Sequence, residues 1–262
     1  MSGLSRNTLW VKCSKPNPQA CFRLFCFPYA GGGASLFRNW ANRLPGEVEV
    51  CAVQLPGRED RLAEPAFTRM LPLIEALASA LSPYLQDKPC AFFGHSMGAF
   101  VSFELARYLR KHHTHAGPLQ LFVSAQRAPQ LPDPEPPIHA LPDNELIEEL
   151  RDLNGTPTEI LQNVEVLELT LPLLRADFAI CETYHFIPGA PLLCPIFACG
   201  GIDDKDIDRE KISAWREQTQ GSFTLRMFPG DHFFLHRSQT ELLQAIYQQL
   251  TSLLRYAAQR YG

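Results

Sequence analysis

The feature that most constrains this chain is the segment 91–99, Ala-Phe-Phe-Gly-His-Ser-Met-Gly-Ala. Apolar residues typical of a buried strand end at Gly94, and a helical pattern of apolar residues follows Ser96. The Gly-x-Ser-x-Gly spacing predicts a sharp strand-to-helix turn that holds the serine in a strained, exposed conformation. A Cβ atom at Gly94 or Gly98 would crowd such a turn. The helix would also direct its positive end at the serine, where it favours negative charge. The alternative interpretation is a buried strand-turn-helix whose serine has no chemical role.

Strand-like and helix-like stretches alternate on both sides of this turn. Strands are predicted over 22–27, 48–55, the residues before Gly94, 119–124, 192–199 (interrupted by Pro195) and 223–228. Helices are predicted over about 35–43, 67–85, 100–111, 208–219 and 240–256, with Asp208 as an N-cap. Residues 1–20 are predicted to be an irregular lead-in. This alternation is typical of an α/β fold, with a mostly parallel sheet covered by helices on both faces.

The alternation stops between about residues 130 and 190. Residues 128–142 contain six prolines, too many for the interior of a strand or helix. A helix is predicted over 143–153, a break over 154–157, and further helix from 158 to about 184 with an interruption near Pro172. We expect a helical insertion that covers a pocket as a lid. The alternative is a helical decoration with no role in access.

Composition and charge limit the classes of protein that fit. The 262 residues, of which 45% are hydrophobic and 20% charged, suit a single domain over 1–262 with a full core. The net charge of −4, without a long basic run, disfavours a nucleic-acid or membrane-surface partner. No apolar run has the length of a membrane span, and residues 1–15 lack the apolar core of a secretion signal. We therefore expect a cytoplasmic protein, and a monomer because nothing resembles a coiled coil or a long exposed apolar stripe.

The cysteines and histidines do not indicate a metal site. The 8 cysteines are scattered without a Cys-x-x-Cys pair, which disfavours structural zinc and favours reduced thiols. Five of them lie in or beside predicted strands and are expected to be buried: Cys26, Cys51, Cys90, Cys194 and Cys199. The cluster of His112, His113 and His115 follows a basic helix end, where a solvated helix terminus is the expected interpretation.

A serine, an aspartate and a histidine each follow a predicted strand, in the chain order of a nucleophilic catalytic triad. A serine hydroxyl needs a base to take its proton, and the base needs an acid to fix its tautomer. In the α/β-hydrolase arrangement these groups occur in the chain order Ser, Asp, His, each after a strand. Here Ser96 follows one strand, Asp203 and Asp204 follow a later one, and His232 follows the last. The order predicts Ser96 as nucleophile and His232 as base.

Competing residues remain for the base and the acid. His236 is the competitor of His232 near a strand end, whereas His95 lies inside the turn and His139 and His185 lie in or beside the insertion. Asp203 and Asp204 are hard to separate, and Asp204 is favoured by its position after the strand. The remaining nearby carboxylates are expected to be surface groups or caps: Asp206, Asp208 and Asp231.

The glycine-rich stretch after the first predicted strand suggests an oxyanion hole. Gly31-x-Gly33 lacks a third small residue, because Leu36 occupies that place, and no Walker Gly-Lys-Ser/Thr follows. A nucleotide site is therefore disfavoured. In a serine hydrolase this loop supplies one backbone N–H, predicted to be that of Ala30, and the residue after the nucleophile, Met97, supplies another.

Seven motifs spread in order over nearly the whole chain resemble one enzyme family. They are 27–32 (Phe-Pro-Tyr-Ala-Gly-Gly), 54–59 (Gln-Leu-Pro-Gly-Arg-Glu), 93–99 (Phe-Gly-His-Ser-Met-Gly-Ala), 153–157 (Leu-Asn-Gly-Thr-Pro), 174–177 (Leu-Arg-Ala-Asp), 200–204 (Gly-Gly-Ile-Asp-Asp) and 229–233 (Pro-Gly-Asp-His-Phe). The chain resembles the stand-alone type II thioesterases of nonribosomal peptide and polyketide synthases and the related medium-chain thioesterases of fatty acid synthase.

The resemblance implies an α/β-hydrolase fold and hydrolysis of acyl thioesters on the phosphopantetheine arm of a carrier protein, which removes misloaded or stalled acyl groups. It implies the nucleophile at Ser96, the histidine at His232, the acid within Asp203–Asp204, and oxyanion donors at Ala30 and Met97. No metal or bound cofactor is implied, because the phosphopantetheine belongs to the substrate. Tyr29 departs from the family, in which many members have histidine; only the neighbouring backbone is needed there.

Four alternatives remain at this stage. The first is a medium-chain fatty acyl thioesterase that releases chains, and the second is a general esterase or lipase acting on oxygen esters. The third is a hydrolase-shaped binding protein with an inert triad. The fourth is an acyltransferase or cyclase; such domains are usually fused to a synthase, and the sequence shows no carrier-like segment, so we expect hydrolysis.

Overall fold

A twisted, mostly parallel sheet organises the molecule. The computed structural model describes residues 8–112, 117–133, 135–153 and 163–261. Within them, seven strands form one sheet in the order β1-β3-β2-β4-β5-β6-β7. All neighbouring pairs are parallel except β1 with β3. The α/β fold with a mostly parallel sheet is therefore confirmed.

The strands occur close to where the apolar runs predict them. They are β1 Val11–Lys12, β2 Phe22–Phe27, β3 Val48–Val53, β4 Cys90–His95, β5 Leu121–Ser124, β6 Ile196–Gly201 and β7 Phe223–Phe228. Every residue of β2, β3, β4, β5 and β6 is buried, as expected for strands covered on both faces. β6 begins after Pro195 rather than at 192, because proline cannot donate to the ladder.

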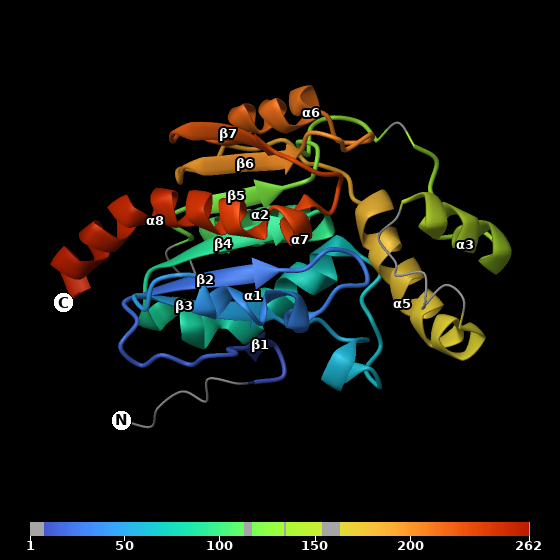
Figure 1. Cartoon of the computed structure of the whole chain (residues 1–262), viewed down its shortest axis with the longest axis horizontal. Coiled ribbons are helices and arrows are strands. Elements are labelled where there is room, and N and C mark those ends of the chain that lie inside the picture. Colours follow the sequence, from blue (N-terminus) through green and yellow to red (C-terminus); the bar gives the residue numbers. More distant parts are fainter. Residues whose placement is uncertain (1–7, 113–116, 134, 154–162, 262) are drawn as a thin grey trace.

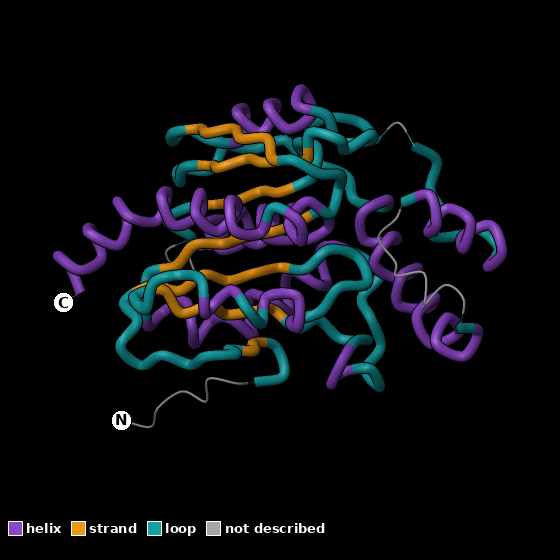
Figure 2. The backbone as a smooth tube through the Cα atoms, in the orientation of Figure 1, coloured by secondary structure: helices purple, strands orange, loops and turns teal. Residues whose placement is uncertain are grey.

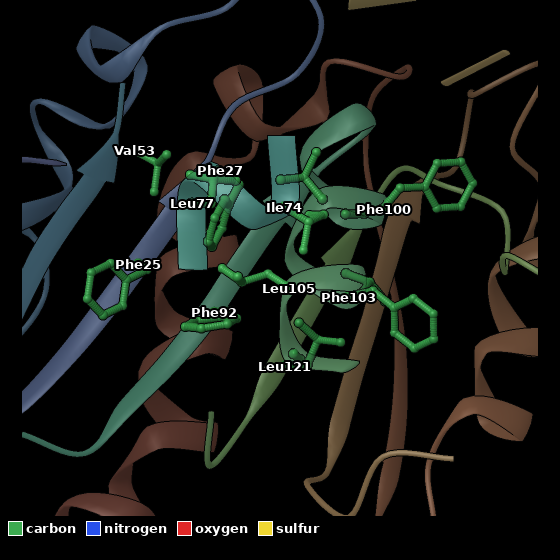
Figure 3. Close-up of a cluster of buried hydrophobic side chains, with 14 of the residues drawn as sticks. Phe25, Phe27, Val53, Ile74, Leu77, Phe92, Phe100, Phe103, Leu105 and Leu121 are labelled. Carbon is green, nitrogen blue, oxygen red and sulfur yellow. The ribbon is translucent and has the colours of Figure 1, made fainter. Parts of the chain in front are cut away.

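Helices cover both faces of the sheet and create two separate apolar clusters (Figure 1). On one face lie α1 Met70–Asp87, α2 Met97–His112 and α6 Arg209–Ser213. On the other lie two 3₁₀ helices, Ala34–Phe37 and Trp40–Asn42, with α7 Phe234–Arg237 and α8 Gln239–Tyr261. Figure 3 shows part of the first cluster, in which side chains of the strands meet those of α1 and α2: Phe25, Phe27, Phe92, Ile74, Leu77 and Leu105.

Among the described residues between β5 and β6, two helices lie outside this layered arrangement. They are α3 Asp143–Asp152 and α5 Val164–Glu182, and they occupy the stretch where the sequence predicts an insertion. Figure 1 shows both beyond the carboxyl ends of the strands, and Figure 2 shows loops between these strand ends and α5. The two helices share a small core of their own, formed by Leu146, Leu150, Leu167, Leu171 and Leu174.

Some local predictions differ from the structure. Helix α5 continues through Pro172 without the expected interruption. Pro172 is exposed, so the carbonyl that it leaves unpaired can be solvated. The expected helix at 35–43 is two 3₁₀ helices, and the one at 208–219 is α6 followed by a 3₁₀ helix, Ala214–Gln218. Strand β1 and helix α7 were not predicted. The expected break at 154–157 lies outside the described residues.

Other predictions concern thiols, histidines and membrane spans. Cys26, Cys51, Cys90 and Cys199 are buried and Cys194 is partly buried, all as free thiols. Of the clustered histidines, His112 ends α2 and bonds the Tyr108 carbonyl, whereas His113 and His115 lie outside the described residues. In the described part of the chain no group of three potential metal ligands occurs, and no helix has the length and apolar character to cross a membrane.

Candidate active site

Ser96 lies at a strained turn between β4 and α2. Its φ of 51° is in the left-handed region, which costs free energy for a residue other than glycine. The turn is possible because two glycines allow close approaches. A Cβ at Gly94 would lie 2.0 Å from the Gly98 carbonyl oxygen, and a Cβ at Gly98 would lie 2.2 Å from the Phe27 carbonyl oxygen. The segment therefore has the geometry predicted for Gly-x-Ser-x-Gly, with Ser96 partly exposed.

The structure pairs Asp204 with His232. The Nδ1 atom of His232 lies 2.8 Å from Oδ2 of Asp204, and this carboxylate is buried. Its other oxygen, Oδ1, accepts the backbone N–H groups of Asp206 at 3.1 Å and Ile207 at 3.0 Å. Asp203 is exposed, and its backbone N–H donates to the Gly230 carbonyl. The geometry thus favours Asp204 over Asp203 as partner of the histidine.

The surroundings of Asp204 keep it ionised. Burial by itself raises the pKa of this carboxyl. The hydrogen bond and positive charge of His232, together with the N–H groups of Ile207 and Asp206, lower the pKa by more than burial raises it. The pKa of Asp204 consequently lies below its ordinary value of 3.8. An ionised carboxylate at Nδ1 fixes the tautomer that leaves Nε2 free to accept a proton, and it stabilises the imidazolium that results.

Neighbouring strands bring these groups to one end of the sheet. β4 lies between β2 and β5, β6 lies beside β5, and β7 is the edge strand beyond β6. The loops after β6 and β7 approach so closely that a Cβ at Gly201 would lie 2.2 Å from the Asp231 carbonyl oxygen. Ser96 and His232 are both partly exposed, and within the described residues no hydrogen bond joins them. Catalytic hydrogen bonds are often long before substrate binds.

His95 packs against His232 and contacts Ser124, and the sequence did not predict these contacts. Its side chain is fully buried, its Nδ1 lies 2.9 Å from the Ser124 hydroxyl, and its ring centroid lies 5.5 Å from that of His232. Burial lowers the pKa of His95 most, and the positive charges of His232 and His236 lower it as well. The pKa therefore lies well below the ordinary value of 6.5. His95 is therefore a neutral packing group. Its pairing with Ser124 depends on strand register, which the sequence does not reveal.

The two predicted oxyanion donors lie on adjoining segments. Met97 is the first residue of α2, so its N–H has no acceptor within the helix. Ala30 lies in the loop after β2, and its N–H donates no hydrogen bond among the described residues. The close approach of Gly98 to the Phe27 and Pro28 carbonyls packs the start of α2 against that loop. N–H groups without an acceptor among the described residues are available to stabilise a developing oxyanion.

The other candidate histidine and the other carboxylates have different partners. His236 is exposed, and its Nε2 lies 3.2 Å from the Tyr29 hydroxyl. Asp208 caps α6 by accepting the Lys211 N–H at 2.8 Å, as predicted, and Asp231 accepts the Phe233 N–H at 2.9 Å. Tyr29 also packs against Phe233, with ring centroids 5.1 Å apart. The residue that departs from the family thus connects the loop after β2 with the loop after β7.

The fold and the site together define a hydrolase of the α/β class, in which a serine at a strand-to-helix turn shares one edge of the sheet with an Asp–His pair. The family model for the thioesterase domain matches residues 22–250, and the chain belongs to this thioesterase family. The family acts on acyl thioesters, and the chain is an acyl-thioester hydrolase.

Two proteins of similar length show which thioesterases this chain resembles. The chain is 45% identical to the gramicidin S biosynthesis protein GrsT of Aneurinibacillus migulanus, over 97% of this chain and 98% of that protein. Among solved structures, the type II thioesterase BorB from the borrelidin biosynthetic cluster is 37% identical, with a TM-score of 0.85 over 94% of this chain and 99% of that one. The resemblance to type II thioesterases is confirmed.

One similar protein has a name of a different kind. The linear gramicidin dehydrogenase LgrE of Brevibacillus parabrevis is 49% identical over 94% of both chains. In this chain, the glycines after β2 lead into the short 3₁₀ helix Ala34–Phe37 rather than into an α-helix whose N-terminus could bind a pyrophosphate. The loop therefore differs from a dinucleotide fingerprint.

Proposed function

We propose that the protein hydrolyses acyl thioesters on the phosphopantetheine arm of carrier proteins and so removes misloaded or stalled acyl groups from a nonribosomal peptide or polyketide synthase. The observation that carries the proposal is the Asp204–His232 hydrogen bond of 2.8 Å at the same sheet edge as the strained Ser96 turn. The biosynthetic relatives support the synthase context: GrsT is named for gramicidin S, and BorB for the borrelidin cluster.

The proposed reaction has two steps. In the first, His232 Nε2 takes the hydroxyl proton of Ser96 while the serine oxygen attacks the thioester carbonyl. The N–H groups of Ala30 and Met97 stabilise the negative oxygen of the tetrahedral intermediate. The intermediate collapses to an acyl-enzyme, and the phosphopantetheine thiolate leaves and receives the proton. In the second step His232 takes a proton from water as the water oxygen attacks the acyl-enzyme carbonyl. The second tetrahedral intermediate then collapses, the bond to the Ser96 oxygen breaks, and His232 returns the proton to that oxygen as the acid is released.

A thioester suits this set of residues. A thiolate leaves more readily than an alkoxide, so a weak general acid suffices for its departure. Every step is performed by side chains and backbone N–H groups of the chain, and the proposed mechanism uses neither a metal ion nor a bound cofactor. The phosphopantetheine arrives with the substrate. We further propose that the protein is a cytoplasmic monomer. It would bind the carrier protein only transiently.

The test compares one acyl group on two carriers of very different size. Short acyl groups are loaded on a purified carrier protein and on free pantetheine, and hydrolysis is followed with the wild-type protein and with Ser96→Ala. We expect faster turnover on the carrier protein and loss of both activities in the variant. Equal or faster turnover on the free thioester would instead indicate a general esterase. A preference for matched oxygen esters would lead to the same conclusion.

A further inference from the structure

Two motifs that no step of the reaction uses meet in the structure. Arg58 belongs to the segment 54–59 after β3, and Asp177 lies on α5, outside the layers of the sheet. The guanidinium binds the carboxylate in a bidentate manner, with Nη1–Oδ2 and Nη2–Oδ1 distances of 2.8 Å. The two side chains are only 4% and 0% exposed. A buried, bidentate ion pair of this kind is costly to desolvate unless its geometry is well satisfied.

Both partners of this pair also hold the loop that contains Ala30. Oδ2 of Asp177 accepts the N–H of Gly31 at 2.7 Å, and Nη1 of Arg58 donates to the carbonyl of Gly32 at 2.9 Å. Leu174, one turn before Asp177 on α5, lies so near that a Cβ at Gly31 would approach its Cδ2 to 2.7 Å. The ion pair thus connects α5 with the glycine loop through direct hydrogen bonds.

The peptide that Asp177 holds adjoins the proposed oxyanion donor, and the peptide that Arg58 holds lies two further along the same loop. The N–H of Gly32 donates to the carbonyl of Tyr29 at 2.9 Å, which closes a turn over residues 29–32. The Tyr29 carbonyl and the Ala30 N–H belong to the same planar peptide and point in opposite directions. The orientation of that peptide therefore sets where the Ala30 N–H points. Asp177 holds the next peptide through the N–H of Gly31, and Arg58 holds the peptide that follows the turn through the carbonyl of Gly32.

We propose that Arg58 and Asp177 are positioning residues of the oxyanion hole, through which the placement of α5 determines the orientation of the Ala30 N–H. This inference rests on the proposed function, because it assigns these residues to the same Ser96 site. Neither residue reacts with the substrate. A displacement of about 1 Å in a catalytic group lowers the rate by about 100-fold, so loss of the pair is expected to slow the chemical step.

The chain offers a matched control pair at the opposite ends of the strands. Arg23 Nε donates to Glu49 Oε2 at 3.0 Å, with side-chain exposures of 4% and 1%. Glu49 also accepts a backbone N–H, that of Asn17, at 3.0 Å. Arg23 and Glu49 lie at the amino ends of β2 and β3, away from the catalytic edge. Replacing Glu49 therefore removes the same kinds of interaction without touching the glycine loop.

The experiment measures kcat and KM for an acyl-pantetheine thioester, together with the inhibition constant of an alkyl trifluoromethyl ketone, which forms a tetrahedral adduct with the serine. We expect Asp177→Ala to lower kcat by about 10- to 100-fold with KM within about 3-fold. The inhibition constant should rise by the same factor as kcat/KM falls. Asp177→Asn, which keeps a carbonyl oxygen for the Gly31 N–H, should give an intermediate kcat. Glu49→Ala and Glu49→Gln should lower the melting temperature but leave kcat within about 3-fold.

Three results would overturn the inference: equal kcat losses for the Asp177 and Glu49 variants, an effect of Asp177 confined to KM, or an unchanged inhibition constant. If Asp177→Ala does not fold, the comparison of Asp177→Asn with Glu49→Gln decides between the same outcomes. Failure of the proposed function is separate, because it would appear as a wild-type protein without Ser96-dependent thioester hydrolysis.

Discussion

Replacing Gly98 with alanine would introduce a Cβ atom 2.2 Å from the Phe27 carbonyl oxygen and 2.7 Å from that of Pro28. Real Cβ atoms are essentially never closer than 3.0 Å to such a neighbour, so the start of α2 and the end of β2 must separate by about 0.8 Å. Both contacts are with backbone, which cannot move aside as a flexible side chain can. The separation would widen the gap between the two proposed oxyanion donors, Met97 and Ala30.

Two effects of this substitution oppose each other in stability. Alanine is favoured over glycine in a helix by about 1 kcal/mol, whereas overpacking costs about 1–3 kcal/mol. We expect the clash to dominate, so that Gly98→Ala lowers the free energy of unfolding. The displacement of the donors should lower kcat by about 100-fold. Urea denaturation and steady-state hydrolysis of an acyl-pantetheine thioester measure the two quantities.

Gly117→Ala is the control, because a Cβ at Gly117 would have no heavy atom within 4 Å. We expect this variant to keep the wild-type kcat. The reasoning would be refuted if Gly98→Ala were as active as Gly117→Ala, or if it were more stable than the wild type, since the helix preference would then outweigh a clash that the structure makes unavoidable.

Three further predictions concern the acid and the insertion. Asp204→Asn should lower kcat by about 10⁴-fold, because the amide no longer fixes the histidine tautomer, whereas Asp203→Asn should stay within about 3-fold in the same thioester assay. Because the pKa of Asp204 is lower in the folded protein than its ordinary value of 3.8, its carboxylate contributes stability that is present above that pH and is lost as the pH falls through the folded value. Urea denaturation at several acid pH values should therefore show a difference between wild type and Asp204→Asn that disappears at low pH, and a constant difference would contradict this. Leu146→Ala, at a fully buried position between α3 and α5, should destabilise that small core by about 2–5 kcal/mol and slow hydrolysis of carrier-bound acyl groups more than that of a small soluble ester. An unchanged rate for both substrates, or greater slowing of the small ester, would contradict a lid role for these helices.

Local patterns were sufficient to predict most of the sheet. The mainly apolar run 22–27 matched β2, which is buried throughout, and the alternating apolar and polar residues of 223–228 matched β7, an edge strand with alternately exposed residues; both matched residue for residue. Strand β1 was not predicted because it has only two residues and pairs antiparallel at the edge, and the apolar run beside it, Leu9-Trp10-Val11, is shorter than the runs that indicate a strand. The effect of Pro172 was overestimated, because whether a proline interrupts a helix depends on whether its freed carbonyl is solvated.

The order of the motifs also placed the candidate side chains near one another. Parallel strands end at one edge, so residues that follow β4, β6 and β7 must meet there. Chain order could not separate Asp203 from Asp204, because neighbouring residues in a loop point in different directions and only tertiary packing selects one. The contacts of His95 with Ser124 and of Asp177 with Arg58 depend on register and on how α5 lies over the sheet. Such contacts join residues far apart in the chain and leave no periodic signal.

The central claim is that Ser96 is the nucleophile of this hydrolase, and covalent labelling tests it most directly. The protein is treated with a fluorophosphonate, and the modified peptide is identified by mass spectrometry, with Ser96→Ala and Asp204→Asn treated in parallel. We predict a single phosphonyl group on Ser96 in the wild type, none on Ser96→Ala, and much slower labelling of Asp204→Asn. Absence of label from the folded wild-type protein, or label on another residue, would contradict the account.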